Sequence, residues 1–187
     1  MRLLLPLAVI MSTFAVGTRG ETQSRPNLVL FTVDDLSMAD TSVYGSQVMK
    51  TPNLKRLSDA GLTFDRFYVS SPTCAPSRAV AASGLYSIRN GCESNHGKLA
   101  VNIKTLPEYL TDLGYTVVTF GKCLAGPMPE PRGYAMEGPN RPKEVTKFLE
   151  SWEGDKPLCI CYGAHNPHGP WAKNKRYKPD EVEIPTG

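Results

Sequence analysis

Two adjacent carboxylates are the first residues in the chain whose positions indicate chemistry. Asp34 and Asp35 directly follow the continuous apolar run 28–33. Neighbouring carboxylates repel each other unless a cation lies between them, so the pair is a candidate site for a hard metal ion. Acidic residues also favour turns, and a simple turn is the alternative interpretation of this pair.

A cysteine in the run 73–78, Thr-Cys-Ala-Pro-Ser-Arg, is the second candidate. The ring of Pro76 fixes the backbone, and a helix beginning here would bring Arg78 back toward Cys74. A thiol beside a cation and a helix N-terminus can act as an activated nucleophile. A structural loop cysteine is the alternative.

Alternating strand and helix patterns place these residues in an α/β domain with a mainly parallel sheet and flanking helices. Thr51 is expected to cap the first helix, which Gly61 ends. A loop rich in proline and glycine is expected over 127–142. The expected strands are 28–33, 63–69, 115–120 and 157–162, and the expected helices are 51–61, a stretch after 78, 104–114 and 143–152.

Three polar groups follow directly after expected strands: Asp34-Asp35, Lys122 and the segment 165–168. In parallel sheets the ligand site lies beyond the carboxyl ends of the strands, so these groups are expected to meet there. Taken singly, Lys122 is an ordinary solvated lysine, and His165 and His168 are a loop pair whose spacing does not indicate zinc. His96, in a glycine-containing loop, is equally well a surface residue.

The N-terminus has the pattern of an export signal. Met1-Arg2 precedes an apolar run over 3–16 and small residues at 17–20, which predicts a signal peptide over 1–20. The run is shorter than the roughly 20 residues of a spanning helix, and no later segment could cross a bilayer. The net charge of +3, without a basic run, does not indicate nucleic-acid binding.

The chain contains five cysteines, so an exported protein would keep at least one thiol unpaired or chemically changed. Cys159 and Cys161 are expected on opposite faces of the last strand and therefore not bonded to each other. Cys74 is the candidate for the cysteine that stays unpaired or is chemically changed.

The run 74–78 resembles the C-x-P-S-R signature of type I sulfatases. The resemblance implies that Cys74 is oxidised to formylglycine by a formylglycine-generating enzyme, and that its hydrated aldehyde is the nucleophile. It further implies calcium held by Asp34, Asp35 and the modified Cys74. Arg78 would steady the hydrated aldehyde, and Lys122, His165 and His168 would bind the sulfate of a sulfated carbohydrate.

The similarity extends over most of the chain. Further matches are 25–27 with 34–36, 51–57 with Gly61 and Phe64, 105–110 with 114–115, the start of a G-K-x-H element at 121–122, and an H-x-P-H segment at 165–168. They imply the N-terminal part of the sulfatase and alkaline-phosphatase-like fold over 25–187, incomplete at its C-terminal end. The segments 95–97 and 165–171 most resemble heparan N-sulfatase (sulfamidase) relatives.

The sequence also departs from the family pattern. Leu124 occupies the histidine position of G-K-x-H, and 81–83 is Ala-Ala-Ser where bulkier apolar residues are usual. The chain is shorter than sulfatases generally are, and their second pair of metal ligands lies beyond residue 187. A sulfatase-like protein that binds sulfated glycans without turnover is therefore an alternative. Two further alternatives are a phosphohydrolase of the alkaline-phosphatase type and a thiol enzyme that uses Cys74.

Overall fold

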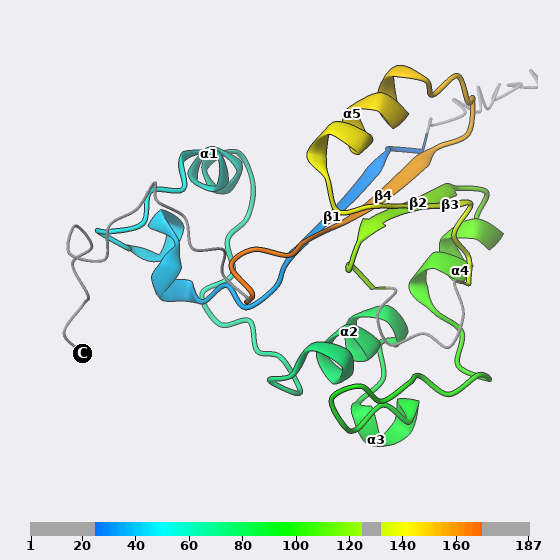
Figure 1. The fold of residues 1–187 in the computed structure, drawn as a ribbon, viewed down its shortest axis with the longest axis horizontal. Helices are drawn as coiled ribbons and strands as arrows, with labels where there is room; N and C mark the ends of the chain where they lie inside the picture. Colours follow the sequence, from blue (N-terminus) through cyan, green and yellow to red (C-terminus); the bar gives the residue numbers. More distant parts are fainter. Residues whose placement is uncertain (1–24, 125–131, 170–187) are drawn as a thin grey trace, which may run out of the picture.

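A four-stranded sheet organises the part of the chain that the computed structural model describes, residues 25–124 and 132–169. All its strand pairs are parallel, and its order is β1-β4-β2-β3 (Figure 1). The structure confirms the α/β class with a parallel sheet. The predicted signal peptide and the tail from residue 170 lie outside the described residues. The strands are β1 (Leu28–Val33), β2 (Thr116–Gly121), β3 (Met136–Gly138) and β4 (Leu158–Ala164).

Five α-helices and two short 3-10 helices connect these strands within the described ranges. They are η1 (Met38–Asp40), η2 (Ser42–Tyr44), α1 (Pro52–Ala60), α2 (Cys74–Ser83), α3 (Ser87–Asn90), α4 (Leu106–Asp112) and α5 (Pro142–Glu150). None of the helices that the structure describes is both long and apolar enough to cross a membrane.

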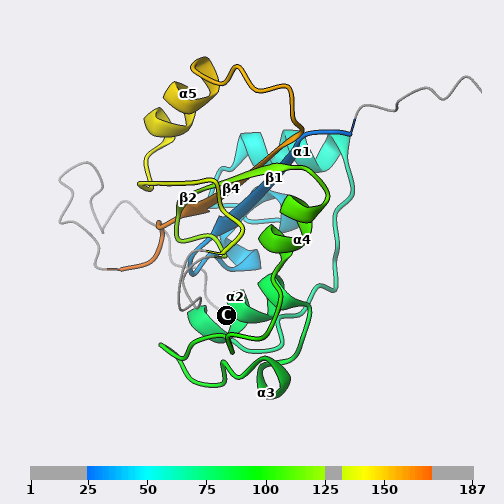
Figure 2. The same ribbon diagram turned by 90° about the vertical axis from the view of Figure 1, so that its right-hand side faces the viewer.

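Helices lie on both faces of the sheet (Figures 1 and 2), although Val29 and Phe31 of the edge strand β1 are exposed. On one face α5 packs against β2, with the rings of Phe148 and Phe120 edge to face at 5.8 Å. On the other face Ala82 of α2 and Leu110 of α4 join the buried cluster that contains Val117 of β2. Burial on both faces explains why β2 and β4 are almost continuously apolar.

Two expectations about strands were wrong. Residues 63–69 form no strand, and Phe64, Phe67 and Tyr68 are 62%, 78% and 83% exposed. An apolar run becomes a strand only where a partner satisfies its backbone groups, and no strand among the described residues pairs with this one. The loop expected over 127–142 contains β3, which is only three residues long and pairs with the end of β2.

The expectation for Cys159 and Cys161 was also wrong. Residues two apart on a strand share a face, and both thiols lie buried in the same cluster with Cys123. All five cysteines are free thiols in the structure. Thr51 precedes α1 as expected, but its hydroxyl pairs with Ser42 rather than capping the helix.

Gly163 lets β4 pass beside the turn that follows β2. A Cβ atom at Gly163 would lie 2.2 Å from the carbonyl carbon of Lys122, 2.3 Å from its oxygen and 2.4 Å from the nitrogen of Cys123. These neighbours are backbone atoms, which cannot swing away as a side chain can. A side chain at this position would therefore displace the 122–123 turn.

We expect Gly163→Ala to lower the free energy of unfolding by about 1–3 kcal/mol, the usual cost of overpacking. Chemical denaturation followed by circular dichroism measures the change. Gly61→Ala is the matched control, since the nearest atom to its new Cβ is one carbonyl oxygen at 3.3 Å and Gly61 is exposed. Equal loss in the two variants would contradict the close approach at Gly163.

Candidate active site

The carboxyl ends of three strands meet at one edge of the sheet, as the sequence predicted. Asp34 follows β1, Lys122 follows β2 and His165 follows β4. The Asp34 amide donates to the carbonyl oxygen of Ala164 at 3.0 Å, so the β1–β4 pairing continues to the first of these residues. The polar groups of three separate segments are thereby neighbours.

Arg78 connects this edge to α2. Its Nη2 donates to Oδ1 of Asp34 at 2.7 Å, and its Nη1 donates to the carbonyl oxygens of Lys122 and Cys123. The side chains of Arg78 and Asp34 are only 9% and 5% exposed. One buried guanidinium therefore joins the end of β1, the turn after β2 and the first two turns of α2.

The surroundings of Asp34 keep it ionised. Burial by itself would raise the pKa of this carboxyl, but the hydrogen bond and charge of Arg78 and the nearby Lys122 charge together hold the pKa below its ordinary value. Lys122 Nζ lies 3.4 Å from Oδ2 of Asp34. Asp34 thus presents a stable negative charge at the strand ends.

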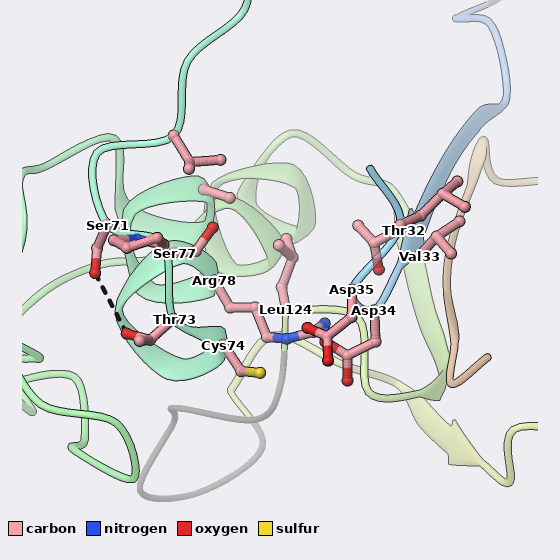
Figure 3. Close-up of a pocket in the computed structure, with 14 residues that line it drawn as sticks. Thr32, Val33, Asp34, Asp35, Ser71, Thr73, Cys74, Ser77, Arg78 and Leu124 are labelled. Carbon is pink, nitrogen blue, oxygen red and sulfur yellow. Dashed lines mark hydrogen bonds and ion pairs between the residues drawn. The ribbon is translucent and has the colours of Figure 1, made fainter. Parts of the chain in front are cut away.

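Cys74 is the first residue of α2, and its side chain points toward Asp34 and Asp35 (Figure 3). The sulfur and one oxygen of each carboxylate all lie within 4.8 Å of one another. They line a cavity of about 430 Å³. Asp35 has φ of 62°, in the left-handed region that Asp tolerates better than most residues, and this turn places its carboxylate beside that of Asp34.

The donor set of this group suits a hard cation. Two carboxylates beside each other provide the oxygens that Ca²⁺ prefers, and an oxygen at the Cys74 position would add another. Calcium takes about 6–8 oxygen ligands, so these three residues can supply only part of its shell. The charge and the ligand types of these residues fit Ca²⁺, but their number does not complete its coordination shell.

Cys74 also lines a second cavity, of about 220 Å³. Arg78, Lys122 and His168 line it together with Asn95 and His96. The sequence left His96 undecided and assigned Asn95 no role. The one sequence signal for them was the resemblance of segment 95–97 to sulfamidases, which did not assign them a role. The structure adds a left-handed backbone at His96, with φ of 69°, in a loop whose position depends on the tertiary structure.

The two histidines after β4 lie beside the carboxylates. His168 Nε2 is 3.8 Å from Oδ2 of Asp35, and the His168 amide donates to the carbonyl oxygen of His165 at 2.9 Å. His165 and Lys122 line a neighbouring cavity. Every residue that the sequence singled out for the site is therefore found at this edge of the sheet.

Leu124 does not provide a polar group to the site. It is 1% exposed, packs in the core cluster with Val117 and Leu110, and forms part of the wall of the cavity that Cys74, Asp34 and Asp35 line. At this position the described site has an apolar surface.

Comparison with known proteins identifies the family. The family model described as Sulfatase matches residues 26–143, a range that includes Asp34, Asp35, Cys74, Arg78 and Lys122 but not the two histidines after β4. The chain is 26% identical over 94% of its length to an N-acetylglucosamine-6-O-sulfatase of Bacteroides thetaiotaomicron, and 33% identical over 66% of its length to an N-acetylgalactosamine-6-sulfatase of Canis lupus familiaris.

Solved structures agree with the sequence matches. A protein in complex with its substrate D-glucosamine-2-N,6-O-disulfate superposes with a TM-score of 0.73 and 25% identity over 80% of this chain. A phosphonate monoester hydrolase of Agrobacterium radiobacter has the same fold, with a TM-score of 0.70 at 16% identity. This chain spans 36% of the length of the first relative, 26% of the second and 36% of the substrate-bound structure. The chain belongs to the sulfatase family.

Proposed function

We propose that this protein is an exported enzyme that hydrolyses a sulfate ester or sulfamate of a sulfated carbohydrate. The observation that supports it most directly is the grouping of Cys74, Asp34 and Asp35 within 4.8 Å, beside the cationic side chains of Arg78 and Lys122. Both carboxylates and cationic side chains therefore lie around Cys74. Such an arrangement can hold both a metal ion and an anionic substrate.

Formylglycine formed from Cys74 would supply a hydrated aldehyde, one hydroxyl of which attacks sulfur while the other allows sulfate to be expelled. An unmodified cysteine or serine would retain the sulfate as a stable ester. Calcium held by Asp34 and Asp35 would supply positive charge beside that hydroxyl. Cys74 lines both the cavity of the carboxylates and the second cavity, where a substrate could approach it.

The roles of the surrounding residues follow from their charges and positions. Arg78 keeps Asp34 ionised and fixes the start of α2 against the sheet. Lys122, whose side chain is 43% exposed, can turn toward a sulfate group in the cavity that it lines with His168. The N-terminus of the ten-residue helix α2 adds partial positive charge at the same place. These groups would stabilise negative charge as the S–O or S–N bond breaks.

The relatives reported above point to a sulfated amino sugar as the substrate. One is named an N-acetylglucosamine-6-O-sulfatase and one an N-acetylgalactosamine-6-sulfatase, and the structural relative was solved with D-glucosamine-2-N,6-O-disulfate. This similarity supports a sulfated sugar as the substrate class. The resemblance to sulfamidases, which extends the choice to an N-sulfate, remains a prediction.

The alternative is a protein that binds sulfated glycans without turnover. The apolar, buried Leu124 favours it, because the side chain at this position of the site cannot bind or protonate a leaving group. The two functions share their anion-binding residues and differ in the chemistry of Cys74. Modification and turnover therefore have to be measured together.

We expect mass spectrometry of the protein, coexpressed with a formylglycine-generating enzyme, to find the Cys74 peptide as the aldehyde. The same preparation should release sulfate from 6-O- or N-sulfated glucosamine. Cys74→Ala should eliminate the release while it keeps the affinity for the sulfated sugar within about twofold, since residues other than Cys74 bind the sulfate.

The same protein expressed without the modifying enzyme is the matched control and should be inactive. An intact thiol with measurable sugar binding and no sulfate release would instead support the binding protein. Alkylation of Cys74 together with loss of activity would indicate a thiol enzyme.

We expect Arg78→Met to lower the free energy of unfolding by about 3–5 kcal/mol, because it leaves the buried Asp34 carboxylate with only its long contact to Lys122 and removes the hydrogen bonds to the carbonyl oxygens of Lys122 and Cys123. Thermal and chemical unfolding measure the loss. Lys55→Met breaks an exposed ion pair with Asp59, which is worth about 0–1 kcal/mol, and is the matched control. A loss at Arg78 no larger than that at Lys55 would contradict the bridging role of Arg78.

A further inference from the structure

We infer that Asp34, His165 and His168 form a binding site for a transition-metal dication such as Zn²⁺. One ligand atom from each of these residues lies within 4.8 Å of the other two. The site shares Asp34 with the candidate calcium site but replaces Asp35 and Cys74 by two imidazoles. The spacing of His165 and His168 along the chain does not indicate zinc, and it is the fold that brings Asp34 to them.

The separations are close to those of a metal centre. Ligand atoms lie about 2.0–2.2 Å from Zn²⁺, so two of them are at most about 4.4 Å apart. The three ligand atoms lie within 4.8 Å of one another. The side chains therefore need to move only slightly to bind an ion. Side-chain rotation of His165, which is exposed, can provide that movement.

The ring of His168 is oriented by a backbone contact. Its Nδ1 lies 2.5 Å from the carbonyl oxygen of Gly169, an atom that can only accept a hydrogen bond, so Nδ1 faces the backbone and Nε2 is the ring nitrogen that a metal could use. Nε2 lies on the side of the carboxylates, 3.8 Å from Oδ2 of Asp35. A histidine that donates its second N–H to a backbone carbonyl is the usual arrangement around metals.

The second imidazole is positioned by the first. The His168 amide donates to the carbonyl oxygen of His165, and the two rings lie with centroids 5.0 Å apart at 42°. This turn comes directly after β4, whose pairing with β1 continues to Asp34. Both rings are therefore placed beside Asp34 by backbone contacts.

Asp34 keeps one oxygen available. Arg78 occupies Oδ1 at 2.7 Å, whereas Oδ2 has only a long contact of 3.4 Å to Lys122. The Lys122 side chain is 43% exposed and can move into solvent when a dication takes its place. Arg78 would remain bound and continue to hold the carboxylate in place.

The ligand types select the metal. Two imidazoles and one carboxylate suit Zn²⁺, Co²⁺ and similar ions, while Ca²⁺ prefers oxygen ligands alone. An ion bound here would occupy His168 and displace Lys122, both of which the proposed function assigns to the sulfate group. Zn²⁺ should therefore compete with sulfated substrates, and this part of the inference rests on the proposed function.

The test is titration of the protein, prepared without a polyhistidine tag, with Co²⁺ in buffer free of Ca²⁺. We expect visible d–d absorption that Zn²⁺ removes. His165→Ala and His168→Ala should each weaken Co²⁺ affinity by about tenfold or more, since loss of even an outer-shell partner costs 10–100-fold. This readout requires neither formylglycine nor turnover, so it is independent of the proposed function.

The chain has three histidines, which makes His96→Ala the matched control. It should leave Co²⁺ affinity unchanged, as should Cys74→Ala. Circular dichroism of each variant checks that the fold is retained. Loss of binding in Cys74→Ala with unchanged affinity in both His165→Ala and His168→Ala would overturn the inference and assign the ion to the Asp34, Asp35 and Cys74 group. Absence of Co²⁺ absorption in the unmodified sequence would overturn it as well.

Discussion

The contact on which the rest of the site depends is the buried ion pair between Arg78 and Asp34. An unpaired charge in this position would be strongly destabilising, so the two residues fix each other. Arg78 also donates to the carbonyl oxygens of Lys122 and Cys123, which ties the turn after β2 to the same guanidinium. Because Cys74 lies one helical turn before Arg78, its place beside the carboxylates follows from this contact.

Small residues allow that contact to form. Ala79 and Ala82 are buried on α2, and Ala82 packs directly in the cluster under the sheet. Of the Ala-Ala-Ser segment that departs from the family pattern, Ala82 belongs to the core while Ala81 is exposed, and Gly84, at φ of 69°, ends α2 in the left-handed conformation. Gly163 has the same effect on the opposite side, where it lets β4 lie against the backbone of Lys122. Bulky side chains at these positions would move Arg78 away from Asp34.

Asp34 is shared among several cations, and this explains how one residue can serve more than one ligand. Arg78 is a permanent partner because it is buried, whereas Lys122 is mostly solvated and its contact is long. A hard ion beside Cys74, a sulfate held by Lys122 and a softer ion on the histidines would each use the same limited space. If these proposals hold, the occupancy of this site would depend on which ions and substrates surround the protein.

The sequence by itself determined the parallel α/β class, the four segments of the site and the identity of its charged residues. Strong local patterns were sufficient for this, because buried strands are continuously apolar and parallel strands must end at one edge. Only the tertiary structure decided that 63–69 is not a strand, that β3 exists, and that Cys123 lies in the buried cluster of Cys159 and Cys161, whose common face the strand period of two already determines. It also decided that Asn95 and His96 reach Cys74, and that Asp34 joins His165 and His168. Such contacts join residues tens of positions apart, and no local periodicity encodes the distance between them.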